Sequence, residues 1–596
     1  LYKMKEEISN RLALLRAEMK KAGVAAAIIP QADAHMSEYL APHWQARRWL
    51  SGFTGSAGDL VVTADEALLW TDSRYFLQAA EQLSGTEIKL MKDGLVSTPS
   101  IGTWLCETLP SGSTVGVDGM LMSVAAARAL RAELEASGLM LTTDFDVIDT
   151  IWSDRPALPQ CKIFAHEVKY AGRTAHEKIV DILAGVGRAH ATSIFISALD
   201  EIAWTLNIRS NDVKYNPVAT AFLYLSPERN IVFIDRAKLD VAAIDHLNEA
   251  GVETAGYSEV KSFLSNLSDE ARVLVEPGRT STAVLELLGT RAVEATSPIA
   301  MLKGCKNAVQ TEGVRQAMVR DGVAMVKSLI EIESRIADGH LTELEVSEIL
   351  RRHRAESPLF FDESFGTIAG YGPHGAIVHY EADEASSSEI KPTGLLLIDS
   401  GAQYYDGTTD LTRTIALGTP TDMERSDFTL VMKGHISLAQ VIFPAGTCGA
   451  QLDALARRFL WQHGLTYLHG TGHGVGHFLN VHEGPQSIRL NYVPAPLTPG
   501  MITSNEPGLY REGIHGIRCE NLVLTVPAMT TEFGDFYKFE TLTLCPFDRK
   551  LFDLSLMTAD EIAWVNDYHA KVRAALSPAL DADSRAWLEK ATAPLE

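Results

Sequence analysis

Apolar and polar positions alternate between a helical and a strand period along the first half of the chain, as in α/β folds. The first run predicts helices over 5–22 and 73–82 and strands over 24–30, 59–63 and 67–72. The second run predicts helices over 174–188 and 199–207 and strands over 193–197, 219–225 and 230–235. Each run therefore predicts an α/β domain.

The two runs carry similar motifs at equivalent positions. Trp70-Thr-Asp-Ser-Arg74 follows an apolar strand in the first run, and Phe233-Ile-Asp-Arg236 does so in the second. We interpret the runs as an internal repeat, although two unrelated α/β stretches would give nearly the same pattern. Proline-containing stretches at 154–160 and 298–306 end the two runs. The predicted domains are 1–158, 159–303 and 304–596.

The third part of the chain has a different pattern. Helical stretches at 310–338 and 342–355 precede a region rich in glycine and strand that ends near Cys545, and a helical tail covers 559–592. Within that region, apolar runs at 394–399 and 411–417 flank turn-forming residues at 404–407. This arrangement predicts a β-hairpin.

The predicted hairpin carries one aspartate on each arm, Asp399 and Asp410. A turn at Asp406-Gly407 would leave them about four residues out of step, or about 13 Å along a strand, whereas a slightly earlier turn would bring them together. The sequence does not decide between these registers. Either aspartate alone is more often a solvated residue at the end of a strand.

Composition and charge fit a multidomain globular protein. The chain has 596 residues, of which 46% are hydrophobic and 22% charged, and its formal net charge is −23. This acidic balance argues against binding to nucleic acid or to an anionic membrane surface, because both attract clustered Lys and Arg.

The cysteines and the apolar runs indicate a cytoplasmic protein. The six cysteines are scattered without a CxxC pair, which is typical of thiols in the cytoplasm rather than of a disulfide framework. No apolar run is long enough to cross a membrane. The charged helical pattern at the start is unlike a signal peptide, but the chain starts with Leu1, so the sequence leaves open whether a segment precedes it.

Five side chains suited to binding metal ions lie in order along the last third of the chain: Asp399, Asp410, His473, Glu506 and Glu520. Four carboxylates and one imidazole are too many for one ion and suit two ions that share carboxylates. One histidine among hard oxygen ligands favours Mn²⁺, with Co²⁺ or Zn²⁺ as alternatives. Two such ions can deprotonate a water molecule and polarise a carbonyl group, which predicts metal-assisted hydrolysis.

The residues around these candidates support a bound group. In His469-Gly-Thr-Gly-His473-Gly-Val-Gly476-His477, the glycines let the backbone approach a bound group closely. Glu520 lies in a predicted strand over 516–524, where a buried carboxylate is costly unless it is paired or binds a metal. Arg518, on the same face of that strand, would then orient a ligand carboxylate, although a surface ion pair is equally consistent with the spacing.

These residues resemble those of the pita-bread metallopeptidase family, which includes methionine aminopeptidase, prolidase and Xaa-Pro aminopeptidase. The three-domain, cytosolic type of Xaa-Pro aminopeptidase is similar along essentially the whole chain. The motifs that carry the resemblance lie at 51–58, 70–75, 199–204, 370–380, 397–404, 406–414, 469–476 and 564–569.

The resemblance implies an α/β and α+β multidomain protein in which two creatinase-N-like α/β domains precede a pita-bread domain made of two related halves. It implies that the five candidates bind two Mn²⁺-like ions, and that Asp410 and Glu520 bridge them. It also implies that Glu506 takes a proton from the water between the ions, and that the enzyme is a homodimer. Three histidines would surround the substrate: His379, His469 and His482.

The implied reaction is release of the N-terminal residue from peptides with proline at the second position, with His482 as the expected oxyanion donor. The resemblance leaves two alternatives. Prolidases cleave Xaa-Pro dipeptides with the same ligands, but they normally have one N-terminal domain, whereas two are predicted here. Catalytically inactive binding proteins on this fold typically lose ligands, and this chain keeps all five. His477 departs from the family, in which a small polar residue is common at that position.

Overall fold

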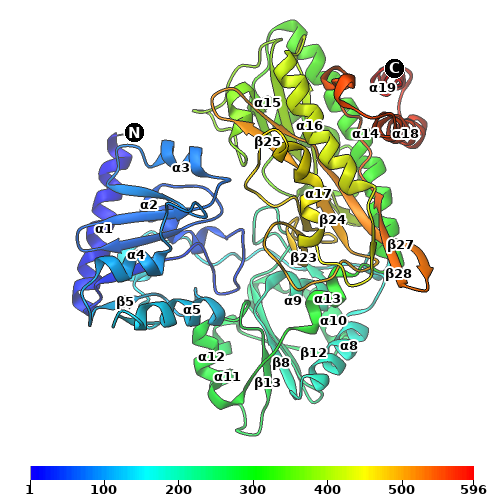
Figure 1. Ribbon diagram of the computed structural model, residues 1–596. Coiled ribbons are helices and arrows are strands. Elements are labelled where there is room, and N and C mark those ends of the chain that lie inside the picture. The colour runs from blue at the N-terminus through cyan, green and yellow to red at the C-terminus, as the bar shows by residue number, and fades with distance from the viewer. Residues whose placement is uncertain (1) are drawn as a thin grey trace. The chain divides into compact units, whose positions relative to one another are not determined.

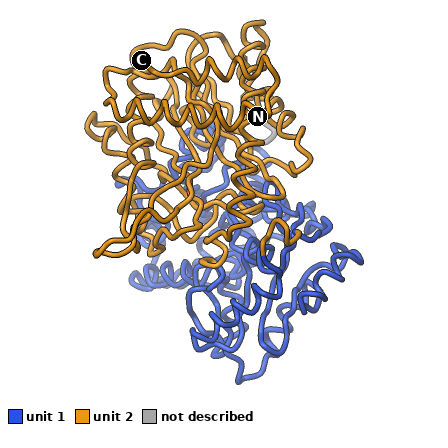
Figure 2. The backbone as a smooth tube through the Cα atoms, turned by 90° about the vertical axis from the view of Figure 1, so that its right-hand side faces the viewer, with its two compact units in different colours: residues 1–166, 173–299 blue, residues 167–172, 300–596 orange. Residues whose placement is uncertain are grey.

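The computed structural model describes residues 2–596, so Leu1 of the predicted first domain lies outside them. The chain forms two compact units, which Figure 2 distinguishes by colour. The first unit contains the chain up to His166 together with Arg173–Ile299, and the second contains Glu167–Gly172 and Ala300–Glu596.

The first unit contains two six-stranded sheets (Figure 1). The first sheet has the order β4-β3-β2-β1-β5-β6. Its strands are β1 (Ala26–Ile29), β2 (Asp59–Thr63), β3 (Ala67–Thr71), β4 (Ile88–Lys92), β5 (Thr114–Gly116) and β6 (Met140–Thr142). Alternate strand residues face opposite sides, and both sides are covered. Helices α1 (Tyr2–Ala22) and α3 (Phe76–Gln82) pack on one face, and α4 (Ile101–Thr108) and α5 (Val124–Glu135) pack on the other.

The second sheet repeats the topology of the first. Its order is β12-β11-β10-β8-β13-β14. The strands are β8 (Ser193–Ile196), β10 (Ala221–Leu225), β11 (Asn230–Ile234), β12 (Val252–Ala255), β13 (Val273–Val275) and β14 (Ala292–Glu294). In both sheets the first strand pairs antiparallel with the second and parallel with the fifth, and the remaining pairs also agree in direction. The shared topology supports the interpretation as an internal repeat, while the boundaries at residues 158 and 303 stay a prediction.

Most predicted helices form, and their ends follow local capping. Helix α14 (Ala308–Asp338) starts two residues before the predicted helix because Asn307 and Gln310 form a capping box, and it ends at Gly339, whose φ is +83°. Helix α15 (Glu343–Arg354) starts at a second capping box. The predicted tail is two helices, α18 (Ala559–Leu576) and α19 (Ala582–Ala591), because Pro578 lies between them and cannot continue a helix.

Two sheets form the centre of the second unit. A three-stranded sheet has the order β16-β17-β20, with β16 (Ile368–Tyr371), β17 (Leu395–Ser400) and β20 (Leu411–Ala416). A six-stranded sheet has the order β21-β28-β27-β24-β22-β23. Its strands are β21 (Ile442–Pro444), β22 (Gly472–Gly474), β23 (Glu483–Ile488), β24 (Ile502–Asn505), β27 (Asn521–Thr531) and β28 (Gly534–Thr541). Helices α14, α16 (Asp422–Ala439) and α18 share one hydrophobic core with strands of both sheets.

The strand predicted over 516–524 is interrupted in the structure. Strand β26 (His515–Arg518) pairs with β25 (Gly508–Arg511), whereas β27 pairs with β24 and β28. At Cys519 and Glu520 the chain passes from the two-stranded sheet of β25 and β26 to the six-stranded sheet. These two residues therefore belong to neither ladder. The backbone N–H of Glu520 instead donates to Thr412 O at 3.2 Å, at the start of β20.

The described residues also bear on the predicted compartment. All six cysteines have free thiols. Within residues 2–596, no helix is both long enough and apolar enough to span a bilayer.

Candidate metal centre

The register of the central hairpin brings the two aspartates close together. Asp399 lies opposite Thr412, and the pairing continues through β18 (Ala402–Tyr404) and β19 (Gly407–Thr408) to a two-residue turn at Tyr405-Asp406. This turn is one residue earlier than Asp406-Gly407. Asp410 therefore lies two residues from the position opposite Asp399 and on the same face, about 7 Å along the strand rather than about 13 Å.

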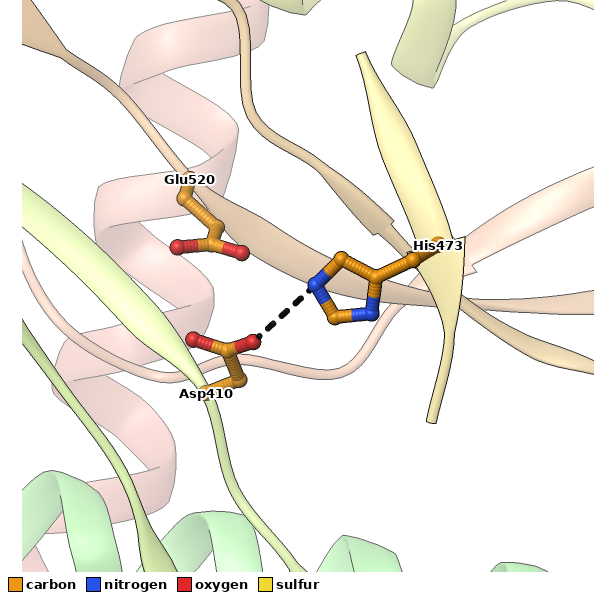
Figure 3. Close-up of side chains that lie close together, drawn as sticks. All are labelled: Asp410, His473 and Glu520. Carbon is orange, nitrogen blue, oxygen red and sulfur yellow. Dashed lines mark ion pairs between the residues drawn. The ribbon is translucent and has the colours of Figure 1, made fainter. Parts of the chain in front are cut away.

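Three candidate ligands from distant parts of the sequence converge (Figure 3). One ligand atom from each of Asp410, His473 and Glu520 lies within 4.8 Å of the others. His473 Nε2 is 3.4 Å from Asp410 Oδ2 and 3.5 Å from Glu506 Oε1, so a fourth candidate adjoins them. The fifth, Asp399, is near enough for its charge to act on Glu520.

Glycines set the position of His473. Its strand, β22, lies between β23 and β24. A Cβ atom on Gly472 would lie 2.0 Å from Ser504 O, and one on Gly474 would lie 2.3 Å from Glu483 O. His473 Nδ1 donates to Gly474 O at 2.9 Å, which leaves Nε2 directed at the carboxylates. The glycines of this motif therefore let β22, which carries the imidazole, pack closely against its neighbouring strands.

Two of the carboxylates, those of Asp399 and Glu520, are oriented by hydrogen bonds that occupy one oxygen each. Arg518 donates to Asp399 Oδ2 through Nη2 at 2.6 Å and through Nε at 3.1 Å. Thr412 Oγ1 donates to Glu520 Oε2 at 2.7 Å. The other oxygens, Asp399 Oδ1 and Glu520 Oε1, are buried and have no hydrogen-bond partner among the described residues. Buried carboxylate oxygens without donors fit divalent cations.

The electrostatics of the cluster also fit cations. Burial raises the pKa of Asp399 to about 6 despite the opposing charge of Arg518. Burial and repulsion from Asp410 and Asp399 raise the pKa of Glu520 well above its usual range, and burial raises the pKa of Glu506. Raised pKa values mean that these carboxyl groups bind protons more tightly than free acids do, and a bound cation would displace those protons.

Two opposing effects act on the pKa of His473, the one imidazole among the five candidate ligands. Burial alone would lower the pKa of His473, but its hydrogen bond with Asp410 and the charge of Glu506 raise that pKa to about 9. The surrounding carboxylates therefore favour the charged form of His473, whose charge would add to that of the nearby Arg518 guanidinium.

The sequence left open which ligand carboxylate Arg518 would orient. It is 1% exposed, so it is not a surface ion pair. The carboxylate it orients is Asp399, because the strand break leaves Glu520 to be held by Thr412. Arg518 also donates to Val378 O at 3.3 Å, next to His379, and through Nη1 to Tyr510 Oη at 2.8 Å.

Two of the three candidate substrate histidines, His469 and His482, lie near this cluster. His469 Nδ1 donates to Gly470 O at 2.7 Å, so Nε2 accepts from the Tyr510 hydroxyl at 2.8 Å. His482 packs edge-on against His473 with 4.4 Å between ring centroids. Residue 483 fixes the His482 segment, because the buried Glu483 carboxylate pairs with Lys303 at 2.6 Å and Lys306 at 2.5 Å.

A buried glutamate anchors the segment that carries His379. Glu343, at the start of α15, accepts from Tyr371 N at 2.7 Å, from His374 Nδ1 at 2.9 Å and from the Tyr380 hydroxyl at 2.8 Å. Sequence reasoning missed both this residue and Tyr510. A capping position in α15 gives no sign of Glu343's role, and the only signal for Tyr510 is its place four residues after Glu506.

Comparisons with known proteins agree along the whole chain. Models of the creatinase/prolidase N-terminal domain match residues 11–150 and 154–310, metallopeptidase family M24 matches 312–527, and the C-terminal region of peptidase M24 matches 535–595. A probable Xaa-Pro aminopeptidase P from Coprinopsis cinerea is 41% identical over 99% of both chains. This chain belongs to the Xaa-Pro aminopeptidase P family. Another member, from Laccaria bicolor, is 42% identical over 98% of this chain and 94% of its own.

A solved structure agrees with this membership. The structure of X-prolyl aminopeptidase from Caenorhabditis elegans, described as a cytosolic enzyme with a di-nuclear active site, is 35% identical and superimposes with a TM-score of 0.95 over 99% of this chain and 100% of that one. Two creatinase-type α/β domains followed by a pita-bread domain are therefore confirmed as the architecture. The chain is a metal-dependent aminopeptidase, a hydrolase.

Proposed function

We propose that this member of the Xaa-Pro aminopeptidase P family releases the N-terminal residue from peptides with proline at the second position. One observation carries the proposal: ligand atoms of Asp410, His473 and Glu520 lie within 4.8 Å of one another. They do so in a chain similar to Xaa-Pro aminopeptidases over its full length.

The residues that we propose would hold two divalent ions are Asp399, Asp410, His473, Glu506 and Glu520. Two divalent ions held there supply a water molecule of lowered pKa and a polarised scissile carbonyl. Four carboxylates among five ligands favour Mn²⁺ over softer ions, with Co²⁺ or Zn²⁺ as alternatives.

Different side chains around the ions transfer the proton and stabilise the developing negative charge. Glu506 accepts the proton of the attacking water and delivers it to the departing nitrogen. His482, edge-on to His473, donates to the oxygen on which negative charge develops. His379 and His469 line the substrate position. Both are tied to Arg518, His379 through the adjacent Val378 carbonyl and His469 through the Tyr510 hydroxyl.

Selectivity for proline follows from the nature of the bond. An Xaa-Pro bond is a tertiary amide without an N–H group. In a site that encloses the proline ring and offers no hydrogen-bond acceptor at that nitrogen, an Xaa-Pro bond buries no unpaired donor. A secondary amide bound there would bury an N–H group without an acceptor, which costs free energy.

The test is hydrolysis of three matched peptides, Xaa-Pro, Xaa-Pro-Yaa and Xaa-Ala-Yaa, by Mn²⁺-reconstituted enzyme. We expect rapid release of the first residue from Xaa-Pro-Yaa alone. Preference for the dipeptide would instead indicate a prolidase. Absence of hydrolysis by protein that holds both ions would indicate the inactive binding protein.

Replacing His482 or His379 by alanine is expected to lower turnover by about 10²-fold while both metal ions stay bound, because neither histidine is a proposed ligand. Metal content and turnover, measured on the same preparations, check this. Loss of metal in proportion to activity would reassign the histidine to the ligand set.

The proposal also covers the oligomeric state, the domain boundaries and the cellular compartment. We propose a cytoplasmic homodimer with domains over 1–158, 159–303 and 304–596, in which the two α/β domains contribute to the dimer contact. Sedimentation velocity of the full chain tests the dimer. A single species at the mass of one 65.0 kDa chain would contradict it.

A further inference from the structure

A buried arginine lies directly behind the ligand Glu520. Thr412 and Arg413 are adjacent on β20, so their side chains project from opposite faces. Thr412 reaches the Glu520 carboxylate, and Arg413 reaches the Glu520 backbone, where Nη1 donates to its carbonyl oxygen at 2.6 Å. The Arg413 side chain therefore fixes the peptide that carries this proposed ligand.

The same guanidinium also contacts the C-terminal extension, the region matched over residues 535–595. Arg413 Nη2 donates to Cys545 O at 2.7 Å, to Asn521 Oδ1 at 2.8 Å and to the Tyr568 hydroxyl at 2.9 Å. Tyr568 lies on α18 and is 5% exposed. Its hydroxyl also lies 2.9 Å from Cys545 O and 3.0 Å from Thr543 O.

Packing holds this tyrosine independently of its hydroxyl. The Tyr568 ring stacks on Trp564 with 5.5 Å between centroids and 6° between planes, and it adjoins Phe547. Arg413 lies over the Phe547 ring, 4.0 Å from its centroid. Removal of the hydroxyl alone should therefore leave α18 docked while it removes one of the three acceptors that orient Nη2 of the guanidinium.

We propose that Tyr568 and Arg413 are positioning residues through which helix α18 sets the affinity of the metal centre. Tyr568 orients the guanidinium, and the guanidinium holds the Glu520 carbonyl, so the Glu520 carboxylate stays aligned with Asp410 and His473. This role rests on the metal ligands proposed above, and it assigns to the extension a task beyond covering the hydrophobic core.

The deciding experiment is Tyr568→Phe in the full chain, with Mn²⁺ binding to demetallated protein measured by titration calorimetry. Partners that orient metal ligands typically contribute 10–100-fold to affinity, so we expect roughly 10-fold weaker binding of at least one ion. The melting temperature of the demetallated variant should fall by no more than about 4 °C, because the ring contacts remain. Unchanged Mn²⁺ affinity in the folded variant would overturn the proposal.

The matched control is Trp587→Phe, which removes a 2.8 Å hydrogen bond from α19 to Glu333 in the same extension but is not linked to Arg413. Its Mn²⁺ affinity should equal that of the unaltered chain. Equal weakening in both variants would indicate general loosening and also overturn the proposal.

Two further outcomes keep the test decisive. If Tyr568→Phe does not fold, Trp564→Phe, which loosens the Tyr568 ring but keeps its hydroxyl, should weaken Mn²⁺ binding several-fold, and unchanged affinity there overturns the proposal. If the unaltered chain binds no Mn²⁺, the metal centre itself fails, and this inference fails with it. Because no substrate enters the measurement, a wrong peptide specificity would not affect the result.

Discussion

Demetallation with a chelator is expected to lower peptide hydrolysis by at least about 10³-fold, and Mn²⁺ is expected to restore it. The expectation follows from the ligand cluster, in which Asp399 Oδ1 and Glu520 Oε1 are buried and receive no hydrogen bond from the part of the chain that the structure describes. A catalytic cation lowers the pKa of a bound water molecule from far above the physiological range to about 7, so loss of the ions removes the nucleophile at neutral pH.

Activity and metal content should be followed together through removal and reconstitution. Circular dichroism of the demetallated protein provides the control for folding. Binding should also raise the stability of the folded state by about 2.7 kcal/mol at a free Mn²⁺ concentration of 100 times Kd. Full hydrolysis by folded protein without bound metal would contradict the dinuclear mechanism.

Glu506→Gln is expected to lower kcat by at least about 10²-fold. The side chain lies 3.5 Å from His473 Nε2 and accepts from Ser504 Oγ at 3.1 Å. Glutamine keeps the shape and one ligand oxygen but cannot accept the proton of the attacking water. The loss should therefore appear in kcat more than in KM.

Because Glu506 is also a proposed ligand, metal content must be measured in the same preparation. Glu512→Gln, the same change six residues away at an exposed position, is the matched control and should keep full activity. Near-normal turnover of Glu506→Gln with both ions bound would remove this residue from the proton transfer.

The sequence predicted the elements of the fold better than their pairing. Strand 59–63 matches β2 at both ends, and the helix predicted over 342–355 differs from α15 by one residue at each end. The hairpin register could not be predicted, because several turns fit the residues at 404–407. In the structure the turn lies at Tyr405-Asp406, one residue earlier than Asp406-Gly407. This shift reduces the offset between Asp399 and Asp410 from about four positions to two.

Contacts between distant segments explain what the sequence could not give. Arg518 was selected for its spacing from Glu520, but its partner is Asp399, 119 residues earlier in the chain. The break at Cys519 and Glu520 follows from pairing with two different sheets, which a local apolar run cannot indicate. Motif spacing therefore identifies candidate ligands, while only tertiary structure shows what orients them.

The contact between Arg413 and Tyr568 has a consequence for the biosynthesis of the protein. Glu520, the last of the five proposed ligands, is translated 48 residues before Tyr568. At roughly 5–20 residues per second, this interval lasts about 2–10 s. During that time, a nascent chain has every ligand but lacks the helix that holds the Glu520 carbonyl. We therefore expect stable metal acquisition only after translation of α18, and prematurely terminated chains that contain all five ligands would lose their ions to cellular chelators.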